Sequence, residues 1–338
     1  MGTTLADLPV EVFSTCPASG AADGPAYVRR AVEVARWSGA YGCRGILVYS
    51  DNSLVDPWLV AQLIVQNTRT LCPLVAVQPA YMHPYTVAKM VATIGHLYGR
   101  RLYLNMVAGG FRNDLLALND PTPHDKRYDR LVEYTTLIKR LLDEGGPVTY
   151  EGEFYRVDKL RLTPAPAPGL SPGVFVSGSS EAGVSAAKAI GATAIRYPKP
   201  VDECAAEPRE PAVESGIRVG IIARGTETEA WSVARTRFPE DRRGQLTHQL
   251  AMKVSDSAWH RQLSEMGGET GRSPYWLVPF ENYKTMCPYL VGSYDRVAQE
   301  LARYIALGDR AFILDVPPDP RELAHTAIVF GKAWEAVA

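Results

Sequence analysis

The stretch Leu102-Tyr-Leu-Asn-Met-Val-Ala-Gly-Gly110 is an apolar run that contains one amide, Asn105, and ends in two glycines. An apolar run of this kind is typical of a strand that is buried on both faces. The glycines after it predict a loop in which the backbone can approach a ligand closely. A buried amide needs hydrogen-bond partners, so Asn105 is expected either to be satisfied within the core or to face a bound molecule.

Similar apolar runs alternate with longer stretches of helical period along the chain. Strands are predicted over residues 10–14, 46–49, 74–78, 102–107, 174–176, 192–195, 217–223 and 312–315. About eight strands that alternate with helices predict a parallel α/β fold, and closure into a TIM (β/α)8 barrel explains the count. A doubly wound sheet also fits the alternation, but no G-x-G-x-x-G motif follows the first strand to support it.

Three segments interrupt the alternation. Residues 147–157 predict a short hairpin outside the barrel, and residues 198–211 are too rich in proline for a full helix, so one barrel helix is expected to be lost or shortened. Residues 245–288 form a long excursion between the seventh predicted strand and its closing helix. Because barrel enzymes build their sites from loops at the C-terminal ends of the strands, this excursion is expected to act as a lid, with a surface decoration as the alternative. Nothing divides the chain, so residues 1–338 are predicted to form a single domain.

The composition excludes several classes of partner. The chain has 338 residues with 36 Lys and Arg against 37 Asp and Glu, which gives a formal net charge of −1. No strong field is therefore expected to attract nucleic acid or an anionic membrane. No apolar run reaches the roughly 18 residues of a membrane helix. The first residues also lack the basic and apolar regions of a signal peptide.

The five cysteines form no CxxC pair, and their number is odd. This pattern argues for a reducing compartment and against a disulfide framework or a zinc site. A cytoplasmic protein without a structural metal is the expectation.

Two further motifs suit a phosphorylated ligand. Val176-Ser-Gly-Ser-Ser180 ends a predicted strand and leads into a helix, whose free N–H groups can bind an anion. His124-Asp-Lys-Arg-Tyr128 begins another helix, and residues four apart lie on one side of it. The alternatives are a plain N-cap at Ser179 or Ser180 and an exposed helix start at His124.

In order and spacing these blocks, with Gly45-Ile-Leu-Val-Tyr-Ser50, Asp56-Pro-Trp-Leu-Val-Ala61 and Gly216-Ile-Arg218, resemble the bacterial luciferase-like, flavin-dependent monooxygenases. The likeness runs from about residue 10 to residue 330 and is nearest to the alkanesulfonate monooxygenase branch. It implies a TIM barrel that binds reduced FMN and uses oxygen to oxygenate a small organic substrate. The chain shows no second nucleotide motif, so a separate NAD(P)H-dependent flavin reductase is expected to supply the reduced FMN. A homo-oligomer is also expected.

The resemblance implies a cofactor site of ten residues. It places the phosphate at Ser179 and Ser180, brings His124 and Tyr128 to the phosphate or ribityl chain, and turns Asn105 toward the flavin. Position at strand ends adds Ser50 and Gln78. The set is completed by Val107, Ser177 and Gly178.

The predicted substrate side departs from the sulfonate branch. Period two over residues 217–222 places Arg218 and Gly220 on one face, and an inward Arg218 would be a buried charge with a catalytic role or a structural ion pair. The sulfonate branch has the same Arg, but a His at Gly220, a Cys at Leu54 and a later Arg near Tyr283. We therefore expect Leu54, Gly220 and Tyr283 to contact a substrate other than a simple alkanesulfonate, with Gly220 opening space for a bulkier molecule.

Two weaker candidates remain. Cys16 follows the first strand and is expected either at the pocket mouth or as a small apolar filler. His83 precedes Pro84 near the end of the third strand, where it could act as an acid or base or simply begin a helix.

Two other functions fit the same barrel. A deazaflavin-dependent hydride-transfer enzyme would need room for a long acidic tail, and it would consume no oxygen. A non-catalytic flavin-binding protein would have its lid packed shut, with no substrate cavity.

Overall fold

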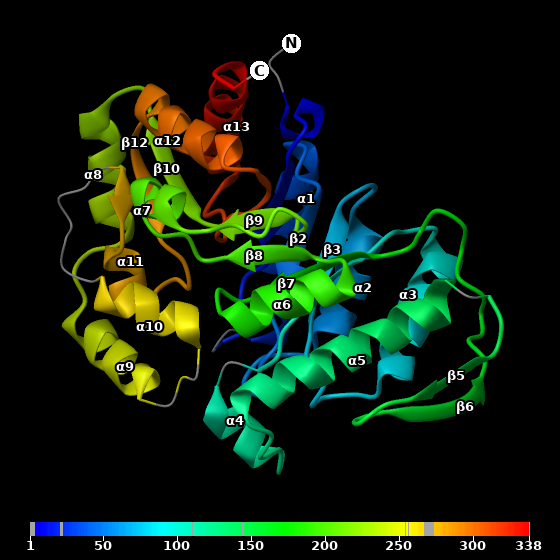
Figure 1. The fold of residues 1–338 in the computed structure, drawn as a ribbon. Coiled ribbons are helices and arrows are strands. Elements are labelled where there is room, and N and C mark those ends of the chain that lie inside the picture. Colours follow the sequence, from blue (N-terminus) through cyan, green and yellow to red (C-terminus); the bar gives the residue numbers. More distant parts are fainter. Residues whose placement is uncertain are drawn as a thin grey trace.

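The computed structural model describes residues 4–20, 23–109, 111–143, 145–253, 255, 257–266 and 274–337. Within them eight parallel strands close into a barrel in the order β1-β13-β9-β8-β7-β4-β3-β2 (Figure 1). The barrel strands are β1 (Glu11–Thr15), β2 (Gly45–Val48), β3 (Cys72–Val77), β4 (Tyr103–Met106), β7 (Gly173–Ser177), β8 (Thr193–Arg196), β9 (Ser215–Arg218) and β13 (Asp309–Ile313). The predicted TIM barrel is confirmed, and each predicted run overlaps one of its strands.

Helices cover the outside of the barrel, and each pair of successive barrel strands is joined by at least one of them, with a further helix after the last strand. They are α1 (Gly24–Ala40), α2 (Pro57–Asn67), α3 (Pro84–Tyr98), α5 (His124–Asp143), α6 (Glu181–Ile190), α7 (Val201–Ala206), α12 (Tyr294–Ala306) and α13 (Pro320–Glu335). The start of α2 shows why a helix begins there, because the Asp56 carboxylate accepts hydrogen bonds from the N–H groups of Trp58 and Leu59. The proline-rich segment does form a helix, α7, but only six residues of it.

Residues 147–157 form the expected hairpin. Strands β5 (Val148–Glu151) and β6 (Arg156–Leu160) pair antiparallel as a separate two-stranded sheet. Figure 1 shows the hairpin beside the end of α5, away from the barrel.

The prediction of one strand over residues 217–223 is wrong. The last barrel bond of this stretch runs from the Val219 N–H to the Ile313 carbonyl, and the Gly220 N–H already bonds to the Pro288 carbonyl. From there β10 (Gly220–Arg224) pairs with β12 (Tyr289–Ser293) in a second sheet, which is completed by β11 (Tyr275–Trp276). Both halves are apolar because both are buried, so the hydrophobic pattern did not mark the break.

This break also corrects the expectation for Gly220. A Cβ atom at Gly220 would lie 2.3 Å from the ring of Tyr289. The missing side chain therefore makes room for Tyr289, which packs on the second sheet, and opens no space for a substrate.

The long excursion and the second sheet lie at the C-terminal ends of the barrel strands. Between β10 and β12 the chain forms α8 (Glu227–Arg237), α9 (Arg242–Met252), α10 (Ala258–Glu265) and α11 (Val278–Glu281). In Figure 1 these helices occupy the left side, toward which β8 and β9 run. A short helix after β4, α4 (Arg112–Ala117), lies at the same end, and a one-turn helix, η1 (Leu5–Asp7), precedes β1.

Three aromatic rings fill the interior of the barrel. Phe13, Tyr103 and Phe175 form edge-to-face pairs with ring centroids 5.0 to 5.5 Å apart. Gly173 permits this packing, because a Cβ atom there would lie 2.3 Å from the Tyr103 ring. These rings fill the barrel interior, as side chains do in TIM barrels generally. Space for a ligand therefore exists only past the rings, at the C-terminal ends of the strands.

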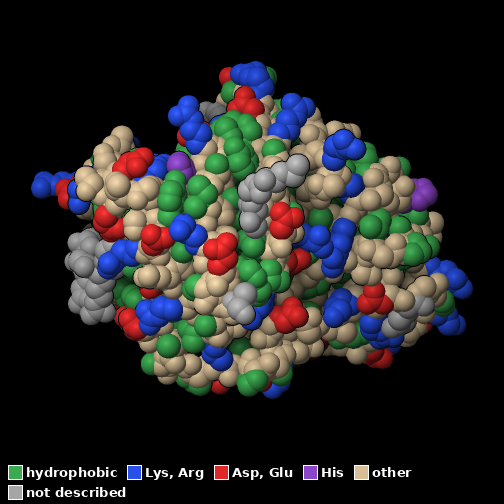
Figure 2. Space-filling model, turned by 90° about the horizontal axis from the view of Figure 1, so that it is seen from above, with side chains coloured by type: hydrophobic (Ala, Val, Ile, Leu, Met, Phe, Trp, Pro, Cys, Tyr) green, Lys and Arg blue, Asp and Glu red, His purple; other side chains and the backbone are tan. Residues whose placement is uncertain are grey.

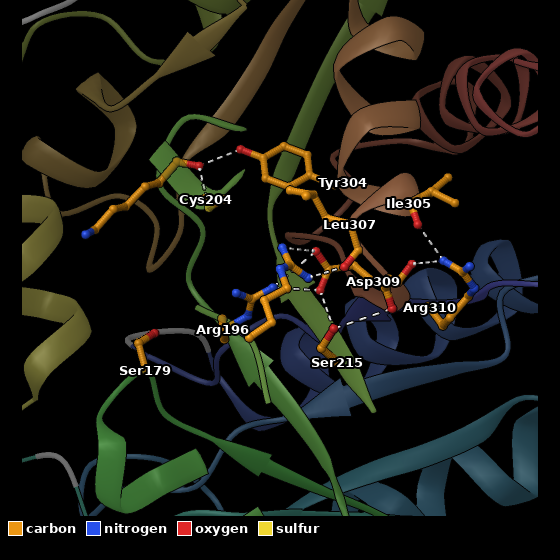
Figure 3. A network of polar contacts seen from close by, with 12 residues as sticks. Ser179, Arg196, Cys204, Ser215, Tyr304, Ile305, Leu307, Asp309 and Arg310 are labelled. Atoms are coloured by element: carbon orange, nitrogen blue, oxygen red, sulfur yellow. Dashed lines mark hydrogen bonds and ion pairs between the residues drawn. The ribbon is translucent and has the colours of Figure 1, made fainter. Parts of the chain in front are cut away.

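A buried carboxylate ties three neighbouring strands together (Figure 3). Asp309, at the start of β13, is fully buried and accepts hydrogen bonds from Arg196 at the end of β8 and Ser215 at the start of β9, at 2.9 and 2.8 Å. Arg209 adds a third contact at 3.3 Å. Because two guanidinium groups surround one carboxylate, its desolvation is compensated by hydrogen bonds and charge.

The face of the molecule seen in Figure 2 shows no dominant charge. Figure 2 shows basic and acidic side chains interspersed over one face, in keeping with the near-zero net charge. Among the described residues no helix has both the length and the apolar character needed to cross a membrane.

The Asp309 network provides a test of the fold. Asp309→Asn keeps the shape but removes the charge, which leaves two largely buried arginines without their carboxylate. We expect the free energy of unfolding in urea to fall by about 3 kcal/mol or more. Asp295→Asn is the matched control, because Asp295 makes a 2.8 Å ion pair with Lys332 on the surface. The free energy of unfolding of Asp295→Asn should change by less than about 0.5 kcal/mol. Equal losses of stability in the two variants would contradict the role of Asp309 in holding the three strands together.

Candidate active site

A cavity of about 570 Å³ lies at the C-terminal ends of the barrel strands. Its size is typical of a site for a small molecule or cofactor. All ten residues predicted for the cofactor line it, together with three predicted for the substrate or for catalysis. These thirteen are Ser50, Leu54, Gln78, Asn105, Val107, His124, Tyr128, Ser177, Gly178, Ser179, Ser180, Arg218 and Tyr283.

The strands position these residues by simple alternation. Side chains two apart on a strand share a face. On β4 and β7 the residue two positions after the core ring therefore also points inward, and it lies nearer the C-terminal end of the strand, where it reaches the cavity. On β4 the inward Tyr103 is followed by Asn105, and on β7 the inward Phe175 is followed by Ser177. The cavity wall is therefore the upper continuation of the barrel core.

Asn105 is a buried amide whose oxygen, but not its NH2 group, has a hydrogen-bond partner among the described residues. Its Oδ1 accepts a hydrogen bond of 2.7 Å from the Ser177 hydroxyl. No residue in the described ranges accepts a hydrogen bond from its Nδ2. Because Asn105 lines the cavity, this amide group is available to a ligand.

Ser179, Ser180 and the Tyr128 hydroxyl lie at the start of α6, and we call this group, which could bind an anion, the anion cradle. Ser180 caps the helix by accepting the Gly183 N–H at 3.1 Å, and the Ser179 hydroxyl oxygen accepts the Tyr197 N–H at 3.3 Å. Each hydroxyl can still donate its own hydrogen, so the N-cap and the ligand role are compatible. The Tyr128 hydroxyl closes the cradle, because it would lie 2.9 Å from a Cβ atom at Gly178.

His124 begins α5 at the edge of this cradle. Its Nδ1 lies 2.8 Å from the Asp125 carboxylate, and its ring packs edge-on against Tyr128. His124 and Tyr128 thus lie on one side of α5, as the four-residue spacing predicted.

Arg218 is a buried cation in the cavity wall. Its side chain ends β9, and the residue is 5% exposed. It donates hydrogen bonds to the hydroxyls of Tyr49 and Tyr197, and its guanidinium lies 4.8 and 5.8 Å from their ring centroids. No carboxylate within the described ranges lies within 4.0 Å of it. The structural ion pair is therefore not formed, and a buried guanidinium without a counter-charge suits an anionic or polarised group of a ligand.

The excursion forms part of the cavity wall. Trp259 of α10 stacks on Tyr197 with ring centroids 3.7 Å apart and an interplanar angle of 9°. His260 beside it is 1% exposed, and its Nε2 has no hydrogen-bond partner among the described residues. Burial, with a smaller contribution from His248, lowers the pKa of His260 to about 4, so the ring is neutral at pH 7. Residues of the predicted lid thus cover the site, and its opening remains a prediction.

Three predicted residues lie outside the cavity, and their expected roles are corrected. Cys16 is buried beside Tyr27, and burial raises the pKa of its thiol to about 12, so it is an apolar filler. His83 is exposed and caps α3, since its Nδ1 accepts the Tyr85 N–H at 3.2 Å. Gly220 packs against Tyr289, as described above.

The structure also adds cavity residues that the sequence did not single out. Tyr49, Tyr197 and Asp315 each come after a barrel strand, two positions beyond an inward residue. Extending the period-two pattern past the strand ends would have found them. Trp259 and His260 enter from the excursion, and no local pattern marks them.

Comparison with known proteins places this site in a family. A sequence model of the luciferase-like monooxygenases matches residues 9–311. The chain is 35% identical over 320 residues, 92% of each chain, to the 4-(gamma-L-glutamylamino)butanoyl-[BtrI acyl-carrier protein] monooxygenase BtrO of Niallia circulans.

Solved structures share the fold. The EDTA monooxygenase EmoA from Chelativorans sp. BNC1 superposes with a TM-score of 0.71 at 15% identity, covering 97% of this chain and 95% of its own. An F420-dependent secondary alcohol dehydrogenase superposes with a TM-score of 0.65 at 16% identity, covering 96% and 99%. With the family model spanning most of the chain, the barrel and its cavity belong to an enzyme, and the protein is a member of the luciferase-like monooxygenase family.

Proposed function

We propose that this protein uses reduced FMN and oxygen to oxygenate an organic substrate. The observation that carries the proposal is the anion cradle of Ser179, Ser180 and Tyr128 inside a cavity large enough for a flavin. A phosphate dianion needs hydroxyl and N–H donors, and the start of α6 supplies both.

The rest of the cavity suits a flavin ring. Asn105 offers its free amide N–H groups, while Val107 and Leu54 contribute apolar surface. Bound FMN would supply the oxygen chemistry itself. The chain's share is to hold the phosphate, orient the ring and exclude water through the excursion, where Trp259 stacks on Tyr197.

The substrate end of the proposal rests on Arg218. A buried guanidinium held by two tyrosine hydroxyls can bind a carboxylate or polarise a carbonyl of the substrate. The relative BtrO is named for an acyl group held on a carrier protein. We infer that this chain also acts on an acyl group delivered by a carrier, and a bare alkanesulfonate is not its substrate.

The cofactor partner is inferred from the sequence. The chain carries no second nucleotide-binding motif, so a separate NAD(P)H-dependent flavin reductase would provide the reduced FMN. We place both proteins in the cytoplasm and expect the oxygenase to be a homo-oligomer. The deazaflavin alternative is supported only by shared fold with the alcohol dehydrogenase.

The two-component arrangement is tested with purified protein. Alone, it should not oxidise NADH or NADPH appreciably, because its sequence shows no second nucleotide-binding motif. It should consume oxygen once reduced FMN is supplied chemically or by an added reductase. Rapid NAD(P)H oxidation by the isolated protein would reject the two-component proposal.

The phosphate cradle is tested by Ser179→Ala with Ser180→Ala. The double variant should bind FMN with a Kd raised about tenfold or more, because a hydrogen bond to a charged group contributes about 1.5 kcal/mol or more. Ser180 also caps α6, so the double variant loses a helix cap as well as the proposed phosphate contacts. Thr226→Ala is the control for the loss of a helix cap alone. Thr226 caps α8 in the same way by accepting the Glu229 N–H, but it does not line the cavity. Unchanged flavin affinity in the double variant would remove the phosphate from this position.

Arg218→Ala separates substrate binding from cofactor binding. Turnover of a carrier-bound acyl substrate should fall about a hundredfold or more, since a preorganised cation is lost. The Kd for FMN should change by no more than about twofold, because Arg218 is proposed to contact the substrate and not the cofactor. A twofold change corresponds to less free energy than the loss of one hydrogen bond. Arg235→Ala, an exposed arginine on α8, is the control for a lost charge. Weakened FMN binding with intact turnover at saturating flavin would show that Arg218 serves the cofactor instead.

A further inference from the structure

A second hollow of about 640 Å³ adjoins the cavity between α4 and α10. We call it the arginine groove, after Arg112, Arg127 and Arg261, which line it. His124 and Ala258 line both the groove and the cavity. The two spaces are therefore neighbours that meet at these residues.

Both flanking elements divide their side chains between the two spaces. In the segment that begins α4, Phe111 lines the cavity while Arg112 lines the groove. On α10, His260 lines the cavity while Arg261 lines the groove. A bridge between Phe111 and Ser255 joins the two segments. The groove and the cavity thus share these two segments as walls.

The groove carries an excess of positive charge. Arg127 is 2% exposed and donates to the Gly109 carbonyl at 2.8 Å. Arg112 and Arg261 are exposed, and neither forms an ion pair or hydrogen bond within the described ranges. The one carboxylate in the lining, Asp120, is held by Arg130 at 2.6 Å and so offsets none of this charge. Two uncompensated guanidinium groups on one groove suit a phosphate.

We propose that the arginine groove binds the phosphate of a phosphopantetheine arm whose acyl end lies in the cavity. The proposal rests on the proposed function, in which the acyl substrate arrives on a carrier. Such an acyl group is a thioester at one end of the arm, and the phosphate is at the other end. A site for this arm needs an anion-binding position outside the cavity, connected to it by open space.

The arrangement keeps the two phosphates apart. The flavin cradle at Ser179 and Ser180 lines only the cavity, whereas Arg112 and Arg261 line only the groove, with His124 between them. Leu116 of α4, which also lines the groove, is 50% exposed and offers apolar surface to the carrier itself.

The experiment compares phosphopantetheine with pantetheine, which lacks the phosphate, by calorimetry on the FMN-loaded protein. The wild type should bind phosphopantetheine about tenfold tighter or more, as expected for a charge-assisted contact. In Arg112→Gln with Arg261→Gln this preference should fall below about threefold, with the Kd for FMN unchanged. Arg242→Gln with Arg243→Gln is the matched control, because both arginines are exposed on α9 and line neither space.

Equal binding of the two probes to the wild type would overturn the proposal, as would a preference that survives the Arg112 and Arg261 substitutions. FAD is the third probe. An arginine-dependent preference for FAD over FMN, without one for phosphopantetheine, would assign the groove to a cofactor tail and also overturn the proposal. FMN binding is measured in the same samples. Its absence would reject the proposed function, whereas intact FMN binding without the phosphate preference rejects only the groove assignment.

Discussion

The alternation of side chains along the barrel strands is the constraint on which the site depends. In a closed barrel each inward residue fixes the position of the next inward residue two places on. Phe13, Tyr103 and Phe175 fill the interior, so the following inward positions, among them Asn105 and Ser177, must line whatever space lies above. One packing rule therefore produces both the core and the wall of the cavity.

Two buried charged side chains of the barrel have different surroundings. Asp309, away from the cavity, has two arginines and a serine around it, and its role is to hold β8, β9 and β13 together. Within the described ranges Arg218 donates hydrogen bonds to two tyrosine hydroxyls, which supply no negative charge. Burial of an arginine is costly unless something offsets it, so the contrast between these two networks separates a structural role from a ligand-binding role.

The segment after β10 shapes the mouth of this barrel. Here the second sheet and the helices after β10 place Trp259 and His260 over the cavity and Arg261 beside it. The same segment thus lines the cavity and also shapes its entrance. The stacking of Trp259 on Tyr197 couples the excursion to the strand end next to Arg218.

The sequence by itself determined the barrel, its eight strands and most of the cofactor side, because continuous apolar runs and strand-end motifs are local. Asn105 and the serines at the start of α6 were found for that reason. Only the tertiary structure decided that the run over residues 217–223 breaks after Arg218, that Gly220 makes room for Tyr289, and that Cys16 and His83 lie away from the cavity. Only the tertiary structure brings Arg112 and Arg261 to one groove, too. These features depend on contacts between segments far apart in the chain, and a hydrophobic pattern reports burial without naming the partner.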